Sequence, residues 1–311
     1  MGGMTDRLML LDTAGIYFRA FYGVPDSVTA PDGTIVNAAR GTLDIVARLV
    51  AQFQPTHLVA CWDDDWRPQW RVDLIPSYKT HRVAEVVELG PDVEDVPDPL
   101  TAQVPIIAES LTLLGIPIVG AAEHEADDVI GTLASTAPMP VDVVTGDRDL
   151  FQLVDDARDV RVIYTGRGMS NLEILDGAAV QAKYGISPAQ YADFATMRGD
   201  ASDGLPGVAG VGEKTAAGLL RDFGSLDGIL AAVADPGSAL SAGVRAKLLA
   251  AADYLAVAPK VVNVVRDLDL PEVDARIRPV DAETAQAARE FAERWGLASA
   301  MTRILGALPA A

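Results

Sequence analysis

The chain has 311 residues, half of them hydrophobic, with 25 Lys and Arg against 44 Asp and Glu and a formal net charge of −19. This composition excludes a disordered or fibrous protein, and the single cysteine, Cys61, excludes an internal disulfide and fits a reducing cytoplasm. The charge argues at first sight against nucleic acid and anionic membrane as partners, and no apolar run approaches the ~20 residues of a membrane span. We therefore expect a soluble, cytoplasmic protein with no membrane partner.

Short apolar, β-branched runs alternate with helical patterns in the first half of the chain. The segment from Val36 to Phe53 carries apolar residues at helical spacing and predicts an amphipathic helix. Strands separated by helices imply a parallel sheet covered on both faces, so we expect an α/β domain. The runs that predict strands are residues 8–12, 57–63, 116–119, 141–145 and 160–164.

Two later segments depart from this rhythm. Residues 83–104 are rich in Asp and Glu, contain three prolines and no Lys or Arg, and predict a solvent-exposed, mobile insertion. After residue 176 the strand patterns stop, and short helices joined by Gly-rich turns follow, of which 204–212 is the clearest. Residues beyond 271 carry an ordinary amphipathic helical pattern.

Carboxylates gather where the predicted strands end. In an open parallel sheet the ligand crevice lies beyond the carboxyl ends of the strands, so these side chains should meet at one edge. A single Asp at such a place is usually a helix cap or turn residue, but the whole set is difficult to explain in that way. The set is Asp12, Asp63, Glu125, Asp127, Asp128, Asp147 and Asp149, with Asp200 and Asp203 in a later loop.

Electrostatics limits what can occupy such a crevice. Two like charges ~5 Å apart at an effective dielectric of ~20 repel by about 3 kcal/mol, so the carboxylates need bound cations to stay ionised together. All-oxygen ligands with no nearby His or Cys suit Mg²⁺ or Mn²⁺. Two such ions are the usual apparatus for hydrolysing a phosphodiester. Asp64 and Asp65, which follow Asp63, either host a third ion or are solvated, and we favour solvation.

Two other motifs could hold phosphate groups. Lys79 and Arg82 lie three residues apart in the most basic stretch and either reach a metal-bound phosphate or form a solvated helix face. Three glycines, Gly207, Gly210 and Gly212, precede a predicted helix that starts near Lys214 and Thr215. Exposed backbone N–H groups at such a turn bind phosphate oxygens, although a tight turn between packed helices is the plainer interpretation of the motif alone.

Together these stretches resemble the flap endonuclease, or 5′-nuclease, family, which includes the 5′-nuclease domain of bacterial DNA polymerase I. The match covers about residues 8–260, in family order and at family spacing. Its parts are Asp12 with Phe18-Arg19-Ala20-Phe21, Asp63 with Trp70-Arg71 and Tyr78-Lys79-Thr80-His81-Arg82, Glu125-Ala126-Asp127-Asp128, Thr145-Gly146-Asp147-Arg148-Asp149, and the run from Gly199 to Thr215.

The resemblance implies an architecture. Residues 1–195 would form a PIN-like (resolvase-like) nuclease domain with a parallel sheet flanked by helices, in which 83–104 takes the place of an arch or clamp. Residues 196–260 would form a helical helix-two-turn-helix (SAM-like) module that binds duplex DNA. Residues 261–311 would be a helical segment that packs back on the core. The chain ends at Ala311, so it resembles a stand-alone nuclease, and the acidic 83–104 differs from the basic arch of family members that thread a 5′ strand.

The resemblance also implies an activity: two-metal-ion cleavage of DNA at 5′ flaps and 5′ ends, in replication and repair. The nine carboxylates would be metal ligands, with Asp128 and Asp147 essential for catalysis, and Lys79 and Arg82 would contact the scissile phosphate. DNA polymerase and ligase would be partners of a monomeric bacterial enzyme, and a K⁺ ion would bind at the Gly-rich turn. The predicted DNA contacts are Phe18, Arg19, Arg71, Gly207, Gly210, Gly212, Lys214 and Thr215.

Two rival hypotheses remain. A PIN-like ribonuclease would share the fold but would have no need of the duplex-binding turn at 207–215. A non-catalytic protein that binds DNA junctions would keep the fold only, yet all nine acidic positions are filled in this sequence.

Overall fold

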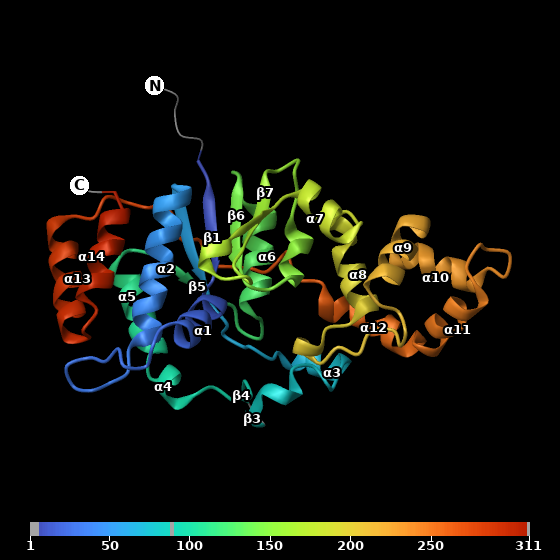
Figure 1. The fold of residues 1–311 in the computed structure, drawn as a ribbon, viewed down its shortest axis with the longest axis horizontal. Helices are drawn as coiled ribbons and strands as arrows, with labels where there is room; N and C mark the ends of the chain where they lie inside the picture. Colours follow the sequence, from blue (N-terminus) through green and yellow to red (C-terminus); the bar gives the residue numbers. More distant parts are fainter. Residues whose placement is uncertain (1–5, 88–89, 310–311) are drawn as a thin grey trace.

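The computed structural model describes residues 6–87 and 90–309. A six-stranded sheet lies at its centre, in the order β5-β2-β1-β6-β7-β8 (Figure 1). The strands are β1 (Leu8–Asp12), β2 (His57–Cys61), β5 (Ile118–Val119), β6 (Val141–Thr145), β7 (Val160–Tyr164) and β8 (Glu173–Leu175). The ends of the predicted segments 1–195 and 261–311, and Glu88 of the acidic insertion, lie outside the described residues.

The sheet confirms the predicted α/β class but differs from the prediction in its edge strand and in the bounds of some strands. All neighbouring pairs are parallel except β7 and β8, which pair antiparallel at one edge, so the sheet is mixed. The β8 strand was not predicted, because it has only three residues and one of them, Ile174, is exposed. The predicted strand at 116–119 is paired only over Ile118–Val119, and the one at 57–63 ends at Cys61.

The alternation of side chains along β1 explains why the sheet has a core on each face. Leu8 and Leu10 belong to one buried cluster, and Met9 and Leu11 belong to the other. Successive side chains of a strand point to opposite faces, so an unbroken apolar run is what a strand covered on both sides requires. The central strands are therefore fixed in register by burial on both faces.

Five helices cover one face of the sheet. They are α1 (Thr13–Gly23), α2 (Asn37–Phe53), α5 (Val104–Leu113), α13 (Ala282–Arg294) and α14 (Ala298–Ala307), which contribute residues to the second cluster. Figure 1 shows α13 and α14 beside α2 and α5, far along the chain from them but next to them in space. The C-terminal segment is thus part of this core, and Arg303 also forms an ion pair of 2.7 Å with Asp44 on α2.

The other face and the far end of the molecule are helical. α6 (Ala126–Thr136), η2 (Asp149–Leu153), α7 (Gly177–Tyr184), α8 (Tyr191–Arg198) and α12 (Ala252–Val262) pack against the sheet or against each other in the first cluster. Beyond them α9 (Glu213–Phe223), α10 (Leu226–Ala234) and α11 (Ala242–Ala250) extend away from the sheet (Figure 1). Short 3-10 turns connect these elements at η3 (Met169–Asn171), η4 (Pro188–Gln190) and η5 (Ala201–Asp203).

The acidic insertion is more firmly attached than its composition predicted. After α3 (Gln69–Leu74) and η1 (Thr80–Arg82), it forms a hairpin of β3 (Val83–Glu85) and β4 (Val93–Glu94), followed by α4 (Asp98–Thr101). Asp92 pairs with the buried Arg67, and the Asp92 carbonyl accepts a 2.7 Å hydrogen bond from the Trp66 indole. The fully buried Gln103 accepts hydrogen bonds from the first N–H groups of α2, so this part of the insertion caps a core helix.

In the part of the chain that the structure describes, no helix is both long enough and apolar enough to cross a membrane.

The packing of α14 leads to a first prediction. Ile304→Ala removes a fully buried side chain between α14 and the α2 core, so it should lower the free energy of unfolding by about 2–4 kcal/mol. Urea denaturation would measure this loss. Thr302→Ala, on the exposed side of the same helix, is the control and should change stability little. Equal effects of the two substitutions would show that the C-terminal segment is not part of the core.

Candidate active site

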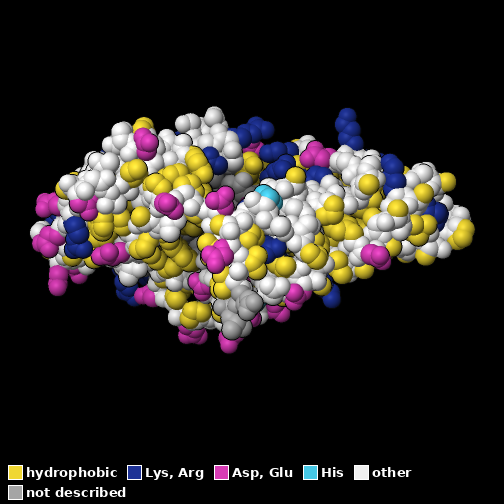
Figure 2. Space-filling model, turned by 90° about the horizontal axis from the view of Figure 1, so that it is seen from below, with side chains coloured by type: hydrophobic (Ala, Val, Ile, Leu, Met, Phe, Trp, Pro, Cys, Tyr) yellow, Lys and Arg dark blue, Asp and Glu magenta, His cyan; other side chains and the backbone are white. Residues whose placement is uncertain are grey.

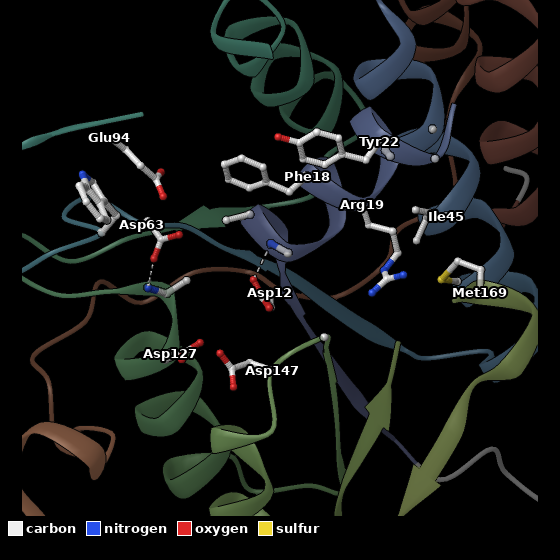
Figure 3. Close-up of a pocket in the computed structure, with 18 of the residues that line it drawn as sticks. Asp12, Phe18, Arg19, Tyr22, Ile45, Asp63, Glu94, Asp127, Asp147 and Met169 are labelled. Atoms are coloured by element: carbon white, nitrogen blue, oxygen red, sulfur yellow. Dashed lines mark hydrogen bonds between the residues drawn. The ribbon is translucent and has the colours of Figure 1, made fainter. Parts of the chain in front are cut away.

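A cleft of about 850 Å³ opens where β1, β2 and β6 end. Its acidic wall carries Asp12 at the end of β1, Asp63 after β2, Asp127 in the first turn of α6, and Asp147 after β6. Figure 3 shows these four carboxylates pointing toward the same space, with Asp127 and Asp147 side by side. The structure thus brings together predicted residues from four separate parts of the sequence.

Local hydrogen bonds hold the carboxylates in place. Asp12 caps α1 through Gly15 N–H at 2.9 Å and accepts a 2.8 Å bond from the Thr145 hydroxyl. The Thr145 oxygen in turn accepts the N–H of Asp147 at 2.9 Å, so one threonine positions two carboxylates. Ala126 N–H at the start of α6 donates to Asp63 at 2.7 Å. Gly15 is required, because a Cβ at that position would lie 2.5 Å from an Asp12 oxygen.

Burial makes this wall unfavourable for ionised groups. It raises the pKa of Asp63 to about 7, although the hydrogen bond from Ala126 and the charge of Lys79 lower it in part. It also raises the pKa of Asp12, Asp127 and Asp147 above the ordinary value. The charge of Asp147 raises the pKa of Asp127 further, since the two like charges face each other. None of these four carboxylates forms a salt bridge within the described residues, so a bound cation would stabilise their ionised forms.

Glu125 also lines the cleft, but the protein itself supplies its counter-charges. Lys79 forms an ion pair with it, Arg71 lies 3.1 Å away, and the Tyr78 hydroxyl donates a 2.7 Å hydrogen bond. Burial alone would raise the pKa of Glu125, but the two cations overcome this effect and lower it. Glu125 therefore stays ionised without a metal.

Asp128 and Arg71 are not placed as predicted. The two terminal guanidinium nitrogens of Arg71 donate to the Asp128 carboxylate, at 2.7 and 2.9 Å, and Val265 N–H donates to the same carboxylate at 2.8 Å. Asp128 has no exposed surface, Arg71 is 2% exposed, and neither lines the cleft. A buried ion pair occupies both side chains in this structure, so neither Asp128 as a metal ligand nor Arg71 as a DNA contact has support from the geometry of the cleft.

The remaining predicted ligands form a second carboxylate group behind Asp147. Asp147 accepts the N–H of Asp149 at 2.8 Å, and the Asp149 carboxylate has one buried oxygen without a hydrogen-bond partner. Burial raises the pKa of Asp149 well above its ordinary value, and Asp147, Asp203 and Asp200 raise it further. Burial likewise raises the pKa of Asp203 to about 6. Asp200 is bound by Ser202 and by Arg198 at 3.2 Å.

This chemistry fits hard divalent cations. The buried oxygen of Asp149 without a hydrogen-bond partner and the four carboxylates of the acidic wall supply oxygen donors that form no ion pair within the described residues. Within residues 6–87 and 90–309, however, no three His, Cys, Asp or Glu side chains converge closely enough to hold an ion by themselves. Asp64 and Asp65 do not line the cleft: Asp64 is exposed, whereas Asp65 is buried, contrary to the solvated position expected, and accepts Arg67 N–H at 3.1 Å.

The cationic side chains Lys79 and Arg82 also line the cleft, next to these acids. Lys79 has a left-handed backbone with φ 47° and precedes the 3-10 turn that presents Arg82. Arg82 donates to the Ser202 carbonyl at 2.8 Å and to Asp203 at 3.2 Å, and Lys79 N–H donates to the Asp203 carbonyl at 3.0 Å. Lys79 and Arg82 are thus hydrogen-bonded to the loop that carries Asp203, a member of the second carboxylate group.

The opposite wall of the cleft is largely apolar. Phe18, Tyr22, Ile45 and Met169 point into it (Figure 3), and Tyr22 is 73% exposed. Arg19 reaches into the same space, and its Nε atom is buried without a hydrogen-bond partner. Tyr22 and Met169 were not predicted. Tyr22 follows Phe18 by four residues on α1 and could have been found from that spacing, whereas Met169 comes from a loop beyond β7.

The Gly-rich turn lies apart from the cleft, before α9. Gly207 and Gly210 have φ of +64° and +73°, a conformation that side-chain-bearing residues rarely adopt. Gly212 precedes α9 without a side-chain cap, and Lys214 is exposed on the first turn while Thr215 is half-buried. The Gly210 carbonyl accepts a 2.9 Å hydrogen bond from Lys247 on α11, so an ammonium group already binds one carbonyl of this turn.

Two family models match nearly all of the chain. The model for the 5′-3′ exonuclease N-terminal resolvase-like domain matches residues 7–185, and the model for the 5′-3′ exonuclease C-terminal SAM fold matches residues 186–283. The chain belongs to the 5′-3′ exonuclease family. It is thus a member of a nuclease family, with the resolvase-like and SAM-fold parts that the sequence predicted.

Named relatives agree with this family. A 5′-3′ exonuclease of Streptomyces coelicolor is 58% identical, and the match covers 97% of this chain and all of the relative. A 5′-3′ exonuclease of Mycobacterium tuberculosis is 50% identical over 98% of both chains. A DNA polymerase I of Mycobacterium bovis is 37% identical over 89% of this chain but only 29% of its own length.

Solved structures share the fold. The T5 D15 protein co-crystallised with metal ions matches with a TM-score of 0.64 at 15% identity, covering 97% of this chain and 99% of that one. Flap endonuclease-1 from Methanococcus jannaschii matches with a TM-score of 0.60 at 16% identity, and the match covers 97% of this chain and 93% of that one.

The raised pKa values predict how the metal-free protein responds to pH. The folded protein binds a proton at Asp63 up to about pH 7, whereas the unfolded chain loses it near the ordinary value of 3.8. The free energy of unfolding therefore falls as the pH rises from 3.8 to about 7, because the folded protein then loses a proton that it binds more tightly than the unfolded chain does. The melting temperature in EDTA should accordingly be higher at pH 6 than at pH 8. Asp63→Asn should weaken this dependence. A melting temperature that rises toward pH 8 in EDTA would contradict the electrostatics of the acidic wall.

The buried ion pair leads to a separate prediction. Arg71→Met leaves Asp128 without its counter-charge and leaves Glu125 with only one of its two cationic partners, Lys79. The substitution should lower the free energy of unfolding by about 3–5 kcal/mol. The double variant Arg71→Met with Asp128→Leu removes both partners of the buried pair and should recover part of that loss. Urea denaturation would measure both variants. An Arg71→Met protein of unchanged stability but weaker DNA binding would restore Arg71 as a DNA contact.

Proposed function

We propose that this chain is a metal-dependent 5′ nuclease that hydrolyses DNA phosphodiesters at 5′ flaps and 5′ ends. The observation that carries the proposal is the acidic wall of the cleft. Four carboxylates come from four separate sequence segments, none has a salt-bridge partner among the described residues, and Lys79 and Arg82 line the same space. A nearby DNA phosphate would meet both cations and bound metal in one place.

We assign the metal ligands to Asp12, Asp63, Asp127 and Asp147 in the cleft and to Asp149, Asp200 and Asp203 behind it, with Glu125 at the border between the groups. Divalent ions held there would lower the pKa of an attacking water and stabilise charge on the scissile phosphate. Mg²⁺ and Mn²⁺ suit these oxygen donors. T5 5′-exonuclease, which shares the fold, has been solved with divalent metal ions (zinc) bound.

The chain's own residues would orient the substrate. Arg82 is partly exposed and can turn from Asp203 toward a phosphate, because its two present bonds are to a carbonyl and a half-buried carboxylate. Lys79 orients Glu125 and brings positive charge to the same wall. Phe18 and Tyr22 offer aromatic faces on which a base can stack, and the unpartnered Arg19 Nε offers a donor beside them.

Duplex binding is assigned to the Gly-rich turn. The backbone N–H groups before and within the first turn of α9, with Lys214 and Thr215, can hold phosphates without recognising sequence. A K⁺ ion at this turn would have to share the Gly210 carbonyl with the Lys247 ammonium group. We propose further that the enzyme works as a monomer in the bacterial cytoplasm with a polymerase and a ligase acting on the same DNA, since every element of the site comes from one chain.

The two rivals differ in what they would cut. A ribonuclease of the same fold would prefer an RNA hairpin to a DNA flap, and a purely junction-binding protein would cut neither. The positive-φ glycines before α9 favour a duplex-binding enzyme. Mapped cleavage of labelled 5′-flap, nicked and gapped DNA and of an RNA hairpin, with Mg²⁺, Mn²⁺ and EDTA, separates the three.

The decisive variants remove one charge each from the acidic wall. Asp147→Asn and Asp127→Asn should reduce cleavage of a 5′ flap with Mn²⁺ by roughly 10²- to 10³-fold, because each removes a ligand charge at the place where transition-state charge develops. Binding of the same flap in Ca²⁺ should be retained, since the phosphate-binding cations are intact. Asp64→Asn, an exposed neighbour of the wall that does not line the cleft, is the control and should cut normally. Near-normal cleavage by both cleft variants would exclude the proposed function.

A further inference from the structure

A second cavity of about 390 Å³ adjoins the active-site cleft on the side of β7 and α7. The two cavities share Gly146 and Asp147, so the second begins where the first ends. Its other walls come from the turn after β7, from the end of α7 and from Ser202. None of the cationic residues that line it was singled out in the sequence, and the cleavage chemistry does not use them. We call it the Lys183 pocket; it is lined by Arg148, Arg167 and Lys183 together with Tyr164 and Tyr184.

The cations of the Lys183 pocket are only partly neutralised. Glu173 on β8 binds Arg167 at 2.7 Å and Lys183 at 2.8 Å, so one carboxylate holds two cations next to each other. Arg148 forms no ion pair within the described part of the chain. Once metal ions balance Asp147 and Asp200 on the shared wall, the pocket has a net positive charge in a chain whose formal charge is −19.

The floor of the pocket is rigid. The rings of Tyr164 and Tyr184 lie 5.2 and 6.1 Å from the buried ring of Phe151. The Lys183 ammonium lies over both tyrosine rings, at 5.4 and 5.8 Å from their centroids. Gly166 keeps the turn close to Tyr164, because a Cβ there would lie 2.1 Å from its ring. The cationic group of Lys183 is thus fixed by packing as well as by Glu173.

Surface charge is grouped rather than evenly spread on the face that Figure 2 shows. On the face shown in Figure 2, Lys and Arg side chains gather at the upper middle and toward the helical right-hand end. Asp and Glu side chains are more frequent on the left and along the lower edge. An acidic protein that binds a polyanion has to do so through such local groups, because its overall field is repulsive.

We propose that the Lys183 pocket binds a backbone phosphate of the DNA strand next to the phosphate that is cleaved. This inference rests on the proposed function, which places the scissile phosphate beside Asp147. Two cations held by one carboxylate and an arginine without an ion pair among the described residues are donors of the kind that phosphate oxygens take in protein–DNA complexes. The pocket extends the binding path by one phosphate and contributes affinity without base recognition.

The test measures binding of a labelled 5′-flap DNA by fluorescence anisotropy, with Ca²⁺ in place of Mn²⁺ and at several salt concentrations. The double variant Arg167→Gln with Lys183→Gln should bind roughly tenfold more weakly, and the slope of log K against log salt should become shallower by about 1–2. Arg148→Gln provides a second, independent loss of a lining cation. The matched control is Arg289→Gln with Arg294→Gln, which removes the same charge from exposed positions on the distant α13 and should leave Kd and slope unchanged.

Two further arms make the outcome specific. Flaps with a 5′-phosphate and with a 5′-hydroxyl should lose affinity equally, since the pocket binds an internal phosphate; a loss confined to the 5′-phosphorylated flap would overturn that assignment. Cleavage by the wild-type protein in Mn²⁺ is measured in parallel. If the wild type does not cut, the proposed function fails. If it cuts and the pocket variants bind as the α13 control does, only the Lys183 pocket assignment is wrong.

Discussion

Desolvation and mutual repulsion of the carboxylates in the cleft are the constraint on which the rest of this structure depends. Asp12, Asp63, Asp127 and Asp147 meet in one cleft because β1 lies between β2 and β6 and all three strands are parallel. Burial raises the pKa of each of these carboxyl groups, and neighbouring like charges raise those of Asp63, Asp127 and Asp147 further. The fold accepts this cost because both faces of the central strands are buried, which fixes the strand ends where they are. The site is therefore stable only with protons or with cations.

The remaining buried acids show what happens when the fold supplies the counter-charge itself. Asp128 is bound by Arg71, Glu125 by Lys79 and Arg71, and the fully buried Asp142 by Arg7 and Arg161. An acid with a cationic partner is ionised without metal and holds elements together. An acid without one is available to a ligand. Asp128 and Asp142, which do not line the cleft, follow this difference. Glu125, Asp200 and Asp203, by contrast, have cationic partners and also lie near the four carboxylates of the acidic wall.

The sequence predicted the sheet and the meeting point of the carboxylates because both follow from local patterns. An apolar β-branched run ending in Asp, as at Leu8–Asp12, shows a strand covered on both faces and a polar group at its carboxyl end. It could not show that Arg71, from α3, would bind Asp128 rather than DNA, since that pairing depends on how α3 packs beside α6 and the Val265 segment. The same holds for Gln103, whose capping of α2 anchors an insertion that composition alone describes as exposed.

The Lys183 pocket illustrates the same limit for binding surfaces. Its cations are spread over the turn after β6, the turn after β7 and the end of α7, and no spacing in the sequence connects them. They converge because β6 and β7 are parallel neighbours and because the short β8 brings Glu173 back between them and α7. An edge strand that the sequence did not predict thus supplies the carboxylate that links two of these cations, Arg167 and Lys183.

The most direct measurement is the number of protons released when Mn²⁺ binds, obtained by calorimetric titration in buffers of different ionisation enthalpy. Because burial raises the pKa of the cleft carboxylates, and that of Asp63 to about 7, metal binding at pH 6 must displace protons. We predict that Mn²⁺ binding releases at least about one proton per protein molecule at pH 6 and fewer at pH 8. Asp63→Asn should release fewer protons than the wild type at pH 6. Tight Mn²⁺ binding without proton release at pH 6 would contradict the account.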